Sequence, residues 1–330
     1  MTFREGVFAQ PENLRGAAAA MRDALAEVDL ARLREGTLVL SGIGASWHAL
    51  VPAVRALRAA GRRAFAVPAP DLADAPAARL GDAFVLVSQS GASAETVAAL
   101  ERIDGAPVVA VTADAASPLA RGAAARLPLG PLPDTSVATL SYTATLQALG
   151  MLCDAILERE SERWDDLPHL AAQTLEVATA DSDAAAARMA RVRAVDAVGG
   201  GAGLASAGET ALLVREALRL PATGAETREY LHGPMEPVDP DFGCFVFGAG
   251  RERRLAETLA GYGAPVVLIG AAAPGVHAFR PPPTGELAAP VLQILPVQLI
   301  VMRLAASRGL AIDGLRRQQD DTKLPTGKAA

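Results

Sequence analysis

The sequence predicts an α/β protein built from two tandem units, each a doubly wound parallel sheet covered by helices. Short apolar segments rich in β-forming residues alternate with alanine-rich helical segments along the chain. A strand, a glycine-rich loop and a helix follow one another twice, after Ser41 and after Val198, which indicates an internal duplication. At 330 residues the chain is long enough for two ordinary domains, and we place them at 1–165 and 166–330.

Composition argues against several classes of partner. Lys and Arg number 31 against 37 Asp and Glu, and the net charge of −6 disfavours nucleic acid or an anionic membrane. The first thirty residues lack the apolar core of a signal peptide, and no uninterrupted apolar run reaches the length of a membrane span. Cys153 and Cys244 lack metal-type spacing. We therefore expect a cytoplasmic protein with free buried thiols and no metal.

The first half is expected to begin with an extended Gln10-Pro11 entry to an alanine-rich helix, because proline restricts the residue before it. Strands and helices then alternate. The elements expected are a helix at 11–28, a strand at 37–41, a helix at 49–60, strands at 64–67 and 84–87, a helix at 94–103, a strand at 107–112 and a helix at 142–158. The last helix is apolar nearly all round, which is typical of a buried helix.

The second half repeats this pattern after a charged stretch at 160–166 and a helix that ends near residue 192. The elements expected are a strand at 194–198, a glycine loop at 199–203, a helix at 206–220, strands at 244–248 and 265–270 with a helix at 253–262 between them, and a last helix at 295–307. A polar tail at 313–330 ends the sequence.

A candidate anion site follows the strand at 84–87. The apolar run stops at Ser88, Gln89 and Ser90, and a helical segment begins just after Ser93. A loop in that place lies at the amino end of a helix, where free backbone N–H groups and the helix dipole favour an anion. The hydroxyls and the amide add donors without adding charge. Ordinary turn and cap chemistry is the alternative for any one of these serines.

The glycine loops do not fit a dinucleotide site. Gly42-Ile43-Gly44 lacks a third glycine at the required spacing, and the second half offers no clear ribose-binding acid after its first strand. We therefore expect no nicotinamide and no other cofactor.

Several motifs together resemble one family. Ser88-Gln89-Ser90-Gly91, with Gly44-Ala45-Ser46-Trp47-His48 before it and Ser136-Val137-Ala138-Thr139 after it, resembles the phosphosugar-binding SIS (sugar isomerase) domain. The second half, from Gly208-Glu209-Thr210 to Leu231-His232-Gly233-Pro234, resembles the second SIS domain in the isomerase portion of glucosamine-6-phosphate synthase (glutamine:fructose-6-phosphate amidotransferase). The resemblance covers nearly the whole chain and implies two tandem SIS domains of flavodoxin-like fold. The family includes amidotransferases, ketose-aldose isomerases, amino-sugar deaminases, fructosamine-6-phosphate deglycases and sugar-phosphate sensors.

The resemblance implies a set of substrate-binding residues. Ser88, Gln89, Ser90 and Ser93 would form the phosphate loop, with Ser93 where the family often has Thr. Ala45 and Ser46 would approach the sugar, Ala45 in place of a frequent hydroxyl residue, and Val137 and Thr139 would line the pocket.

The resemblance also implies catalytic residues. Glu216 matches the carboxylate that moves a proton between C1 and C2, and its apolar neighbours are expected to raise its pKa. The alternative is a surface glutamate paired with Arg219. Glu209, two turns earlier on much the same face, is expected to support it.

His232 matches the ring-opening histidine, which in the family commonly comes from the neighbouring subunit, so we expect a homodimer with shared active sites. Lys323 matches a C-terminal lysine that can form an imine with an open-chain ketose. The alternatives are a structural histidine and an unpaired lysine in a polar tail.

Three departures from the synthase shape the expected reaction. No glutaminase domain or amino-terminal nucleophilic cysteine precedes the SIS pair, so we expect that glutamine is not the direct ammonia donor. Leu213 and Ser141 stand where the synthase has lysines. We expect aldose-ketose isomerisation of a ketose or amino-sugar 6-phosphate, with or without amine release. The alternative is a non-catalytic sugar-phosphate sensor, although no DNA-binding module is visible.

Overall fold

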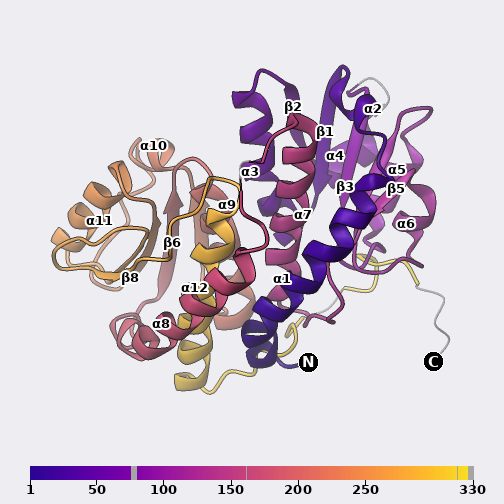
Figure 1. The fold of residues 1–330 in the computed structure, drawn as a ribbon. Helices are drawn as coiled ribbons and strands as arrows, with labels where there is room; N and C mark the ends of the chain where they lie inside the picture. The colour runs from indigo at the N-terminus through magenta and orange to yellow at the C-terminus, as the bar shows by residue number, and fades with distance from the viewer. Residues whose placement is uncertain (76–79, 161, 318, 326–330) are drawn as a thin grey trace. The chain divides into compact units, whose positions relative to one another are not determined.

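The computed structural model describes residues 1–75, 80–160, 162–317 and 319–325. The chain divides into two compact units, each with its own sheet (Figure 1). The β1–β5 unit comprises residues 12–132, 141–165 and 317–330, and the β6–β10 unit comprises residues 1–11, 133–140 and 166–316. Each unit thus includes segments from both sides of residue 165, and the predicted domain boundary there remains a prediction.

The elements follow the predicted alternation. Up to residue 157 they are α1 (Phe3–Ala26), α2 (Leu30–Arg34), β1 (Thr37–Gly42), α3 (Ala45–Ala59), β2 (Arg63–Pro68), α4 (Ala69–Asp74), β3 (Ala83–Val87), α5 (Ala94–Glu101), β4 (Val108–Val111), α6 (Pro118–Gly122), β5 (Ala125–Leu127) and α7 (Leu140–Leu157). They continue with α8 (Leu167–Arg188), β6 (Ala194–Gly199), α9 (Gly203–Leu213), the π-helical turn η2 (Val214–Leu218), β7 (Ala222–Ala225), α10 (Thr227–Tyr230), β8 (Phe242–Phe247), α11 (Arg251–Gly261), β9 (Val266–Ile269), β10 (His277–Phe279) and α12 (Ala289–Ser307).

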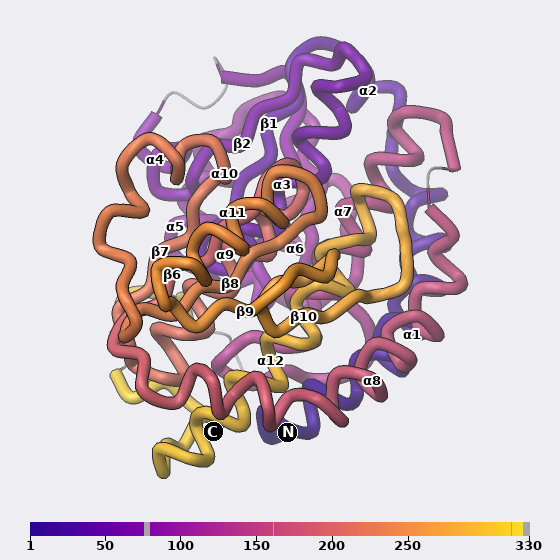
Figure 2. The backbone as a smooth tube through the Cα atoms, turned by 90° about the vertical axis from the view of Figure 1, so that its left-hand side faces the viewer, coloured from indigo at the N-terminus to yellow at the C-terminus, as the bar shows by residue number. Residues whose placement is uncertain are grey.

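Both sheets are parallel and share one strand order. The first sheet is β2-β1-β3-β4-β5, and the second, taken from its β7 edge, is β7-β6-β8-β9-β10. Figure 2 shows β6, β8, β9 and β10 side by side in that order. All residues of β3 and β8 are buried, as expected for strands covered on both faces. The predicted fold class is confirmed, and the matching orders agree with the predicted duplication.

The order of strands defines where a ligand is expected. In each sheet the second strand is added on one side of the first and the later strands on the other side. The order therefore reverses between β1 and β3 in the first sheet and between β6 and β8 in the second. Open parallel sheets bind ligands beyond the carboxyl ends of such strands. In the first sheet, the loops that contain Ser46 and Ser88 both follow these ends, since Ser41 of β1 pairs with Leu86 of β3.

The N-terminal helix starts earlier than expected. Instead of an extended entry at Gln10-Pro11, α1 begins at Phe3 and runs through Pro11. Proline lacks the N–H that would bond to the carbonyl of Val7, but the Gln10 side chain supplies a donor, with its Nε2 3.0 Å from that oxygen. Asp313 Oδ1 accepts from the Phe3 N–H at 2.8 Å and caps the helix. The expected entry is wrong because a side chain replaces the missing backbone donor.

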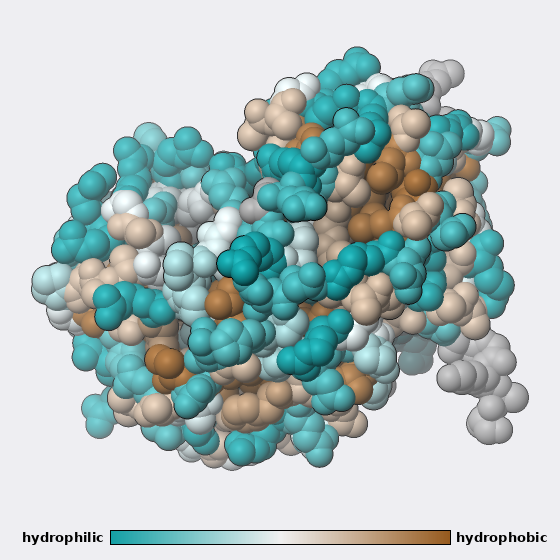
Figure 3. All heavy atoms as spheres, in the orientation of Figure 1, coloured by the Kyte–Doolittle hydropathy of each residue, from teal (hydrophilic) through white to brown (hydrophobic). Residues whose placement is uncertain are grey.

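Helices α7 and α12 are long and apolar enough to cross a membrane by length and composition. Within their apolar windows, however, 89% of α7 and 72% of α12 is buried inside the protein, which is typical of core helices. On the face drawn in Figure 3, hydrophilic residues are spread among smaller hydrophobic groups.

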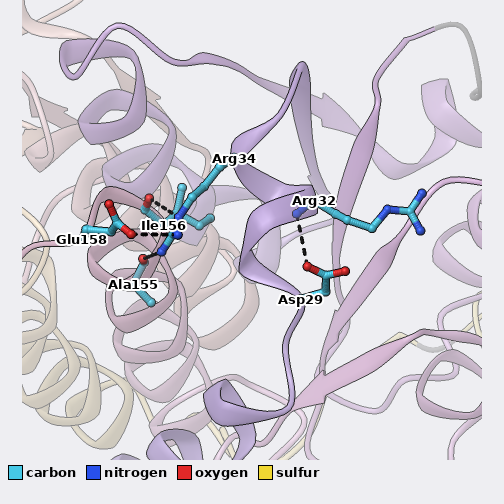
Figure 4. A network of polar contacts seen from close by, with 6 residues as sticks. All are labelled: Asp29, Arg32, Arg34, Ala155, Ile156 and Glu158. Atoms are coloured by element: carbon cyan, nitrogen blue, oxygen red, sulfur yellow. Dashed lines mark hydrogen bonds and ion pairs between the residues drawn. The ribbon is translucent and has the colours of Figure 1, made fainter.

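Helix α2 caps the carboxyl end of α7. The Arg34 guanidinium donates to the carbonyls of Ile156 at 3.1 Å and Ala155 at 2.9 Å, and lies 2.8 Å from the Glu158 carboxylate (Figure 4). Cationic donors at a helix carboxyl end satisfy carbonyls that lack intrahelical partners. Helix α2 is thereby tied to α7.

Several short elements were not predicted. They are α2, α4, α6, α10, β5, β7 and β10, each of three to six residues. Unlike the four-residue strands β4 and β9, which are continuous apolar runs, these segments show neither an apolar run nor a clear periodicity. Helix α12 also begins at Ala289, six residues before the predicted start, and continues through Pro296.

Candidate functional site

The predicted phosphate loop lies between β3 and α5. Ser88 is buried at the end of β3, and its hydroxyl oxygen lies 3.0 Å from that of Ser93. The Ser90 hydroxyl accepts from the Ala92 N–H at 3.3 Å, and Gln89 and Ser90 are half-buried. The tertiary structure therefore gathers the predicted hydroxyls at one end of one strand.

Gly91 is required by the shape of this loop. Its φ is +62°, and a Cβ atom at this position would lie 2.1 Å from the Ser117 hydroxyl and 2.7 Å from that of Thr112. Thr112 in turn donates to the Gln89 carbonyl at 3.2 Å. Ser117 and Thr112 were missed from the sequence. Ser117 precedes Pro118 and caps α6, a helix-start signal that was available.

The C-terminal tail pairs with the phosphate loop. The Leu324 N–H donates to the Ala92 carbonyl at 2.8 Å, and the Ala94 N–H donates to the Thr322 carbonyl at 3.1 Å. Ser93 and Lys323 thereby face each other in an isolated antiparallel bridge. Lys323 is exposed beside the loop. The N–H groups at the start of α5 were expected to be available to an anion. One of them, that of Ala94, instead donates to the carbonyl of Thr322 in the tail.

Ala45 and Ser46 begin α3, directly after Gly44, whose φ is +59°. Both are half-buried. A Cβ atom on Gly42 would lie 3.0 Å from the Ser46 Cβ, so the turn from β1 into α3 is tight. These two residues follow the carboxyl end of β1, beside the strand that ends at Ser88.

Glu216 lies in the π-helical turn η2 at the end of α9. Such turns widen a helix and are frequent at functional sites. Burial raises the pKa of Glu216 to about 7. The guanidinium of Arg219 donates to the Ala311 carbonyl at 3.1 Å. Among the described residues no ion pair joins Arg219 to Glu216. The described structure therefore does not contain the surface ion pair that was the alternative explanation for Glu216.

Glu209 is the most deeply buried carboxyl of the β6–β10 unit, at 0% exposed. Neither of its carboxyl oxygens has a hydrogen-bond partner within the described part of the chain. Burial raises its pKa well above the usual range, and the nearby charges of Glu216 and Asp134 raise it further. Strand β7 lies close to α9 beside Glu209, because a Cβ atom on Gly224 would lie only 2.8 Å from the Gly208 Cα.

Val137 and Thr139 are fully buried in the β6–β10 unit. The Thr139 hydroxyl donates to Asp134 Oδ1 at 2.6 Å, and its N–H donates to Oδ2 at 2.9 Å. A Cβ atom on Gly6 would lie 2.2 Å from the Thr139 hydroxyl oxygen, so α1 approaches closely here. The Thr139 hydroxyl thus bonds within the protein, and the backbone of this segment is fixed by Asp134.

His232 lies in an exposed turn that follows α10. Its N–H donates to the Glu229 carbonyl at 3.0 Å, and Gly233, with φ +128°, comes next. The imidazole is open to solvent. His48 differs, because burial lowers its pKa to about 4, as expected for a structural histidine.

The structure thus sorts the predicted residues into two groups. The β1–β5 unit holds the phosphate loop, Ala45, Ser46 and Lys323, and the β6–β10 unit holds Val137, Thr139, Glu209, Glu216 and His232. Among the described residues, no group of three or more His, Cys, Asp or Glu side chains is placed to hold a metal ion.

Comparison with known proteins identifies one domain. Residues 33–157 match the model of the SIS domain. The chain is 29% identical to a glutamine–fructose-6-phosphate aminotransferase (isomerizing) from Pyrobaculum aerophilum, over 92% of this chain and 54% of that protein. A protein of the same name from Rhizobium leguminosarum bv. viciae is 28% identical over 70% of this chain and 42% of its own. The chain thus spans about half the length of these relatives.

Solved structures share the fold over nearly the whole chain. A glucosamine-6-phosphate deaminase from Thermotoga maritima superposes with a TM-score of 0.77, covering 96% of this chain and 98% of that one. A tagatose-6-phosphate ketose/aldose isomerase from Escherichia coli gives a TM-score of 0.80 and covers 94% of both chains. Each is 21% identical to this chain, so the likeness extends to the fold alone.

Proposed function

We propose that this chain, whose residues 33–157 form a SIS domain, is an enzyme that moves a proton between C1 and C2 of a ketose or amino-sugar 6-phosphate. The reaction is aldose-ketose isomerisation, with or without release of the amine. In this assignment Ser88, Gln89, Ser90 and Ser93 bind the phosphate, Ala45 and Ser46 approach the sugar, and Val137 and Thr139 belong to the segment assigned to the sugar pocket in the other unit.

The observation that carries the proposal is the raised pKa of the Glu216 carboxyl. A general base works best when its pKa lies near the pH at which it operates, and burial raises the pKa of Glu216 to about 7. The carboxylate takes the proton from one carbon of the open-chain sugar, an enediol or enolamine forms, and the carboxylic acid returns the proton to the neighbouring carbon. Burial, with the nearby charges of Glu216 and Asp134, raises the pKa of Glu209 and so favours its protonated form.

His232 and Lys323 complete the assignment. His232 moves the proton that opens the sugar ring, a role supported by its exposed position in the turn after α10. Lys323 orients the open-chain carbonyl or forms an imine with it, a role supported by its position opposite Ser93 of the phosphate loop.

Solvent deuterium tests the reaction. Fructose 6-phosphate, glucosamine 6-phosphate and fructosamine 6-phosphates are incubated with the protein in D2O, and label at C1 or C2 is measured by NMR together with released ammonia or amino acid. Deuterium enters the sugar with the unaltered protein and not with Glu216→Gln, while both bind the sugar phosphate. Binding without label in the unaltered protein would instead identify a sugar-phosphate sensor, in which the phosphate loop is kept and the chemistry is not.

We also propose a cytoplasmic homodimer in which His232 of one subunit serves the site of the other. Mixing Glu216→Gln and His232→Ala proteins tests this, because a hybrid dimer would contain one intact site. Shared sites restore up to about a quarter of the activity after subunit exchange. Native mass spectrometry verifies that hybrid dimers form. If the mixture remains inactive although hybrids are present, the shared site is contradicted.

A further inference from the structure

The His232 turn is held at its two ends. Residues 231–234 are exposed, whereas Tyr230 is 1% exposed and Met235 packs against the core cluster of the β6–β10 unit. The backbone hydrogen bonds of this exposed stretch are local, from the N–H groups of Leu231 and His232 to carbonyls of α10 and from that of Glu236 to the Gly233 carbonyl. The position of His232 therefore depends on the residues that anchor the turn.

Tyr230 provides the anchor on the side of His232. Its hydroxyl donates to Asp196 Oδ2 at 2.8 Å. Asp196 lies in the middle of β6, 6% exposed, and pairs with Cys244 of β8 and Thr223 of β7 in the sheet. A carboxylate in an interior strand costs free energy unless it is hydrogen-bonded, and the Tyr230 hydroxyl provides that bond.

Helix α10 has little stability of its own. It contains only four residues, too few for an isolated helix, and its start is capped by Glu226, which accepts from the N–H groups of Arg228 at 2.6 Å and Glu229 at 3.2 Å. The cap shapes the helical turn locally. The bond from Tyr230 to Asp196 fixes this turn to the sheet.

We propose that Asp196 and Tyr230 are positioning residues for His232, tying the turn that carries the imidazole to β6, an interior strand of the second sheet. The inference rests on the proposed role of His232 in ring opening. Neither residue needs to contact the substrate. Burial raises the pKa of Asp196 while the Tyr230 bond opposes that shift, which agrees with a closely coupled pair.

The first test measures the turn itself, without substrate. Tyr230→Phe keeps the ring and removes the hydroxyl, Asp196→Asn keeps an acceptor for that hydroxyl, and Tyr262→Phe is a matched control on an exposed tyrosine of the same unit, 52% exposed. We expect amide hydrogen exchange in residues 231–238 to rise about tenfold in Tyr230→Phe and to stay near the unaltered rate in the other two. Unchanged exchange in Tyr230→Phe would overturn the proposal, whatever the protein catalyses.

The second test separates ring opening from proton transfer. Fructose 6-phosphate is compared with 5-deoxyfructose 6-phosphate, which cannot close a furanose ring. Tyr230→Phe should lower kcat for the first substrate about tenfold and leave kcat for the second unchanged, while His232→Ala should abolish turnover of the first substrate. Equal losses on both substrates would overturn the positioning role. Absence of turnover in the unaltered protein would count against the proposed function, while the exchange measurement still decides the anchor.

Discussion

Lys323 of the C-terminal tail and Ser93 of the phosphate loop face each other in an antiparallel bridge, although 230 positions separate them. The flanking hydrogen bonds, from Leu324 to Ala92 and from Ala94 to Thr322, involve backbone groups only. The tail is therefore placed by its backbone, and among the described residues the Lys323 side chain forms no hydrogen bond or ion pair.

Removing one of these backbone bonds should reduce activity. Leu324→Pro lacks the N–H that donates to Ala92, whereas Leu324→Ala keeps it and removes only the side chain. We expect kcat/KM to fall at least about fivefold in Leu324→Pro, as for a lost hydrogen bond of about 1 kcal/mol, and to change little in Leu324→Ala. Equal activities of the two variants would show that the pairing does not serve the site.

The phosphate loop should not tolerate a side chain at Gly91. Gly91→Ala combines a left-handed φ with a clash against Ser117 and Thr112, whereas Gly105, with φ +71°, has no atom within 4 Å of its Cβ position. Gly105→Ala is therefore a control for the backbone strain alone. We expect Gly91→Ala to lower the free energy of unfolding by about 2 kcal/mol more than the control and to weaken binding of sugar phosphates. Urea denaturation and isothermal titration calorimetry measure the two effects.

Activity should rise with pH through the pKa of Glu216. The base must be ionised to take a proton, and burial raises the pKa of Glu216 to about 7. The acid limb of the profile of kcat/KM against pH should therefore have its midpoint near pH 7. A midpoint near pH 4.5, the ordinary value for glutamate, would contradict the raised pKa of Glu216.

The same carboxyl should make the fold less stable at higher pH. Its pKa is about 7 in the folded protein and near 4.5 in the unfolded chain, so the folded state holds the proton more tightly. The contribution to stability is present below pH 4.5 and is lost as the pH rises to about 7, by up to about 3 kcal/mol. Urea unfolding of Glu216→Gln should show a weaker fall in stability across this range, and identical pH profiles would contradict the raised pKa.

The two thiols should be unreactive in the folded state. Burial raises the pKa of both Cys153 and Cys244 to about 12, so thiolate is scarce at pH 8. Ellman's reagent should label neither cysteine in the folded protein and both in 6 M guanidinium. Rapid labelling of the folded protein would show that one of them reaches solvent.

Local patterns in the sequence determined most of the fold. The apolar runs at β1, β3, β6, β8 and β9 and the long helical segments are properties of neighbouring residues, and they specified two parallel α/β units. The position of the predicted phosphate loop between a strand and a helix was also predictable, because its polar residues and Gly91 lie within one short segment. The raised pKa of Glu216 was predictable from the apolar residues that surround it on a helical segment.

The tertiary structure decided what depends on residues distant in sequence. Pro11 does not end α1, because the Gln10 side chain bonds to Val7 and Asp313 caps the helix from the far end of the chain. The Thr139 hydroxyl donates to Asp134, and Lys323 is placed by backbone bonds to the predicted phosphate loop. Asp196, an unremarked residue in a strand, becomes the partner of Tyr230. Each of these contacts satisfies a buried or terminal polar group, and the partner of such a group is set by packing, which local sequence patterns do not encode.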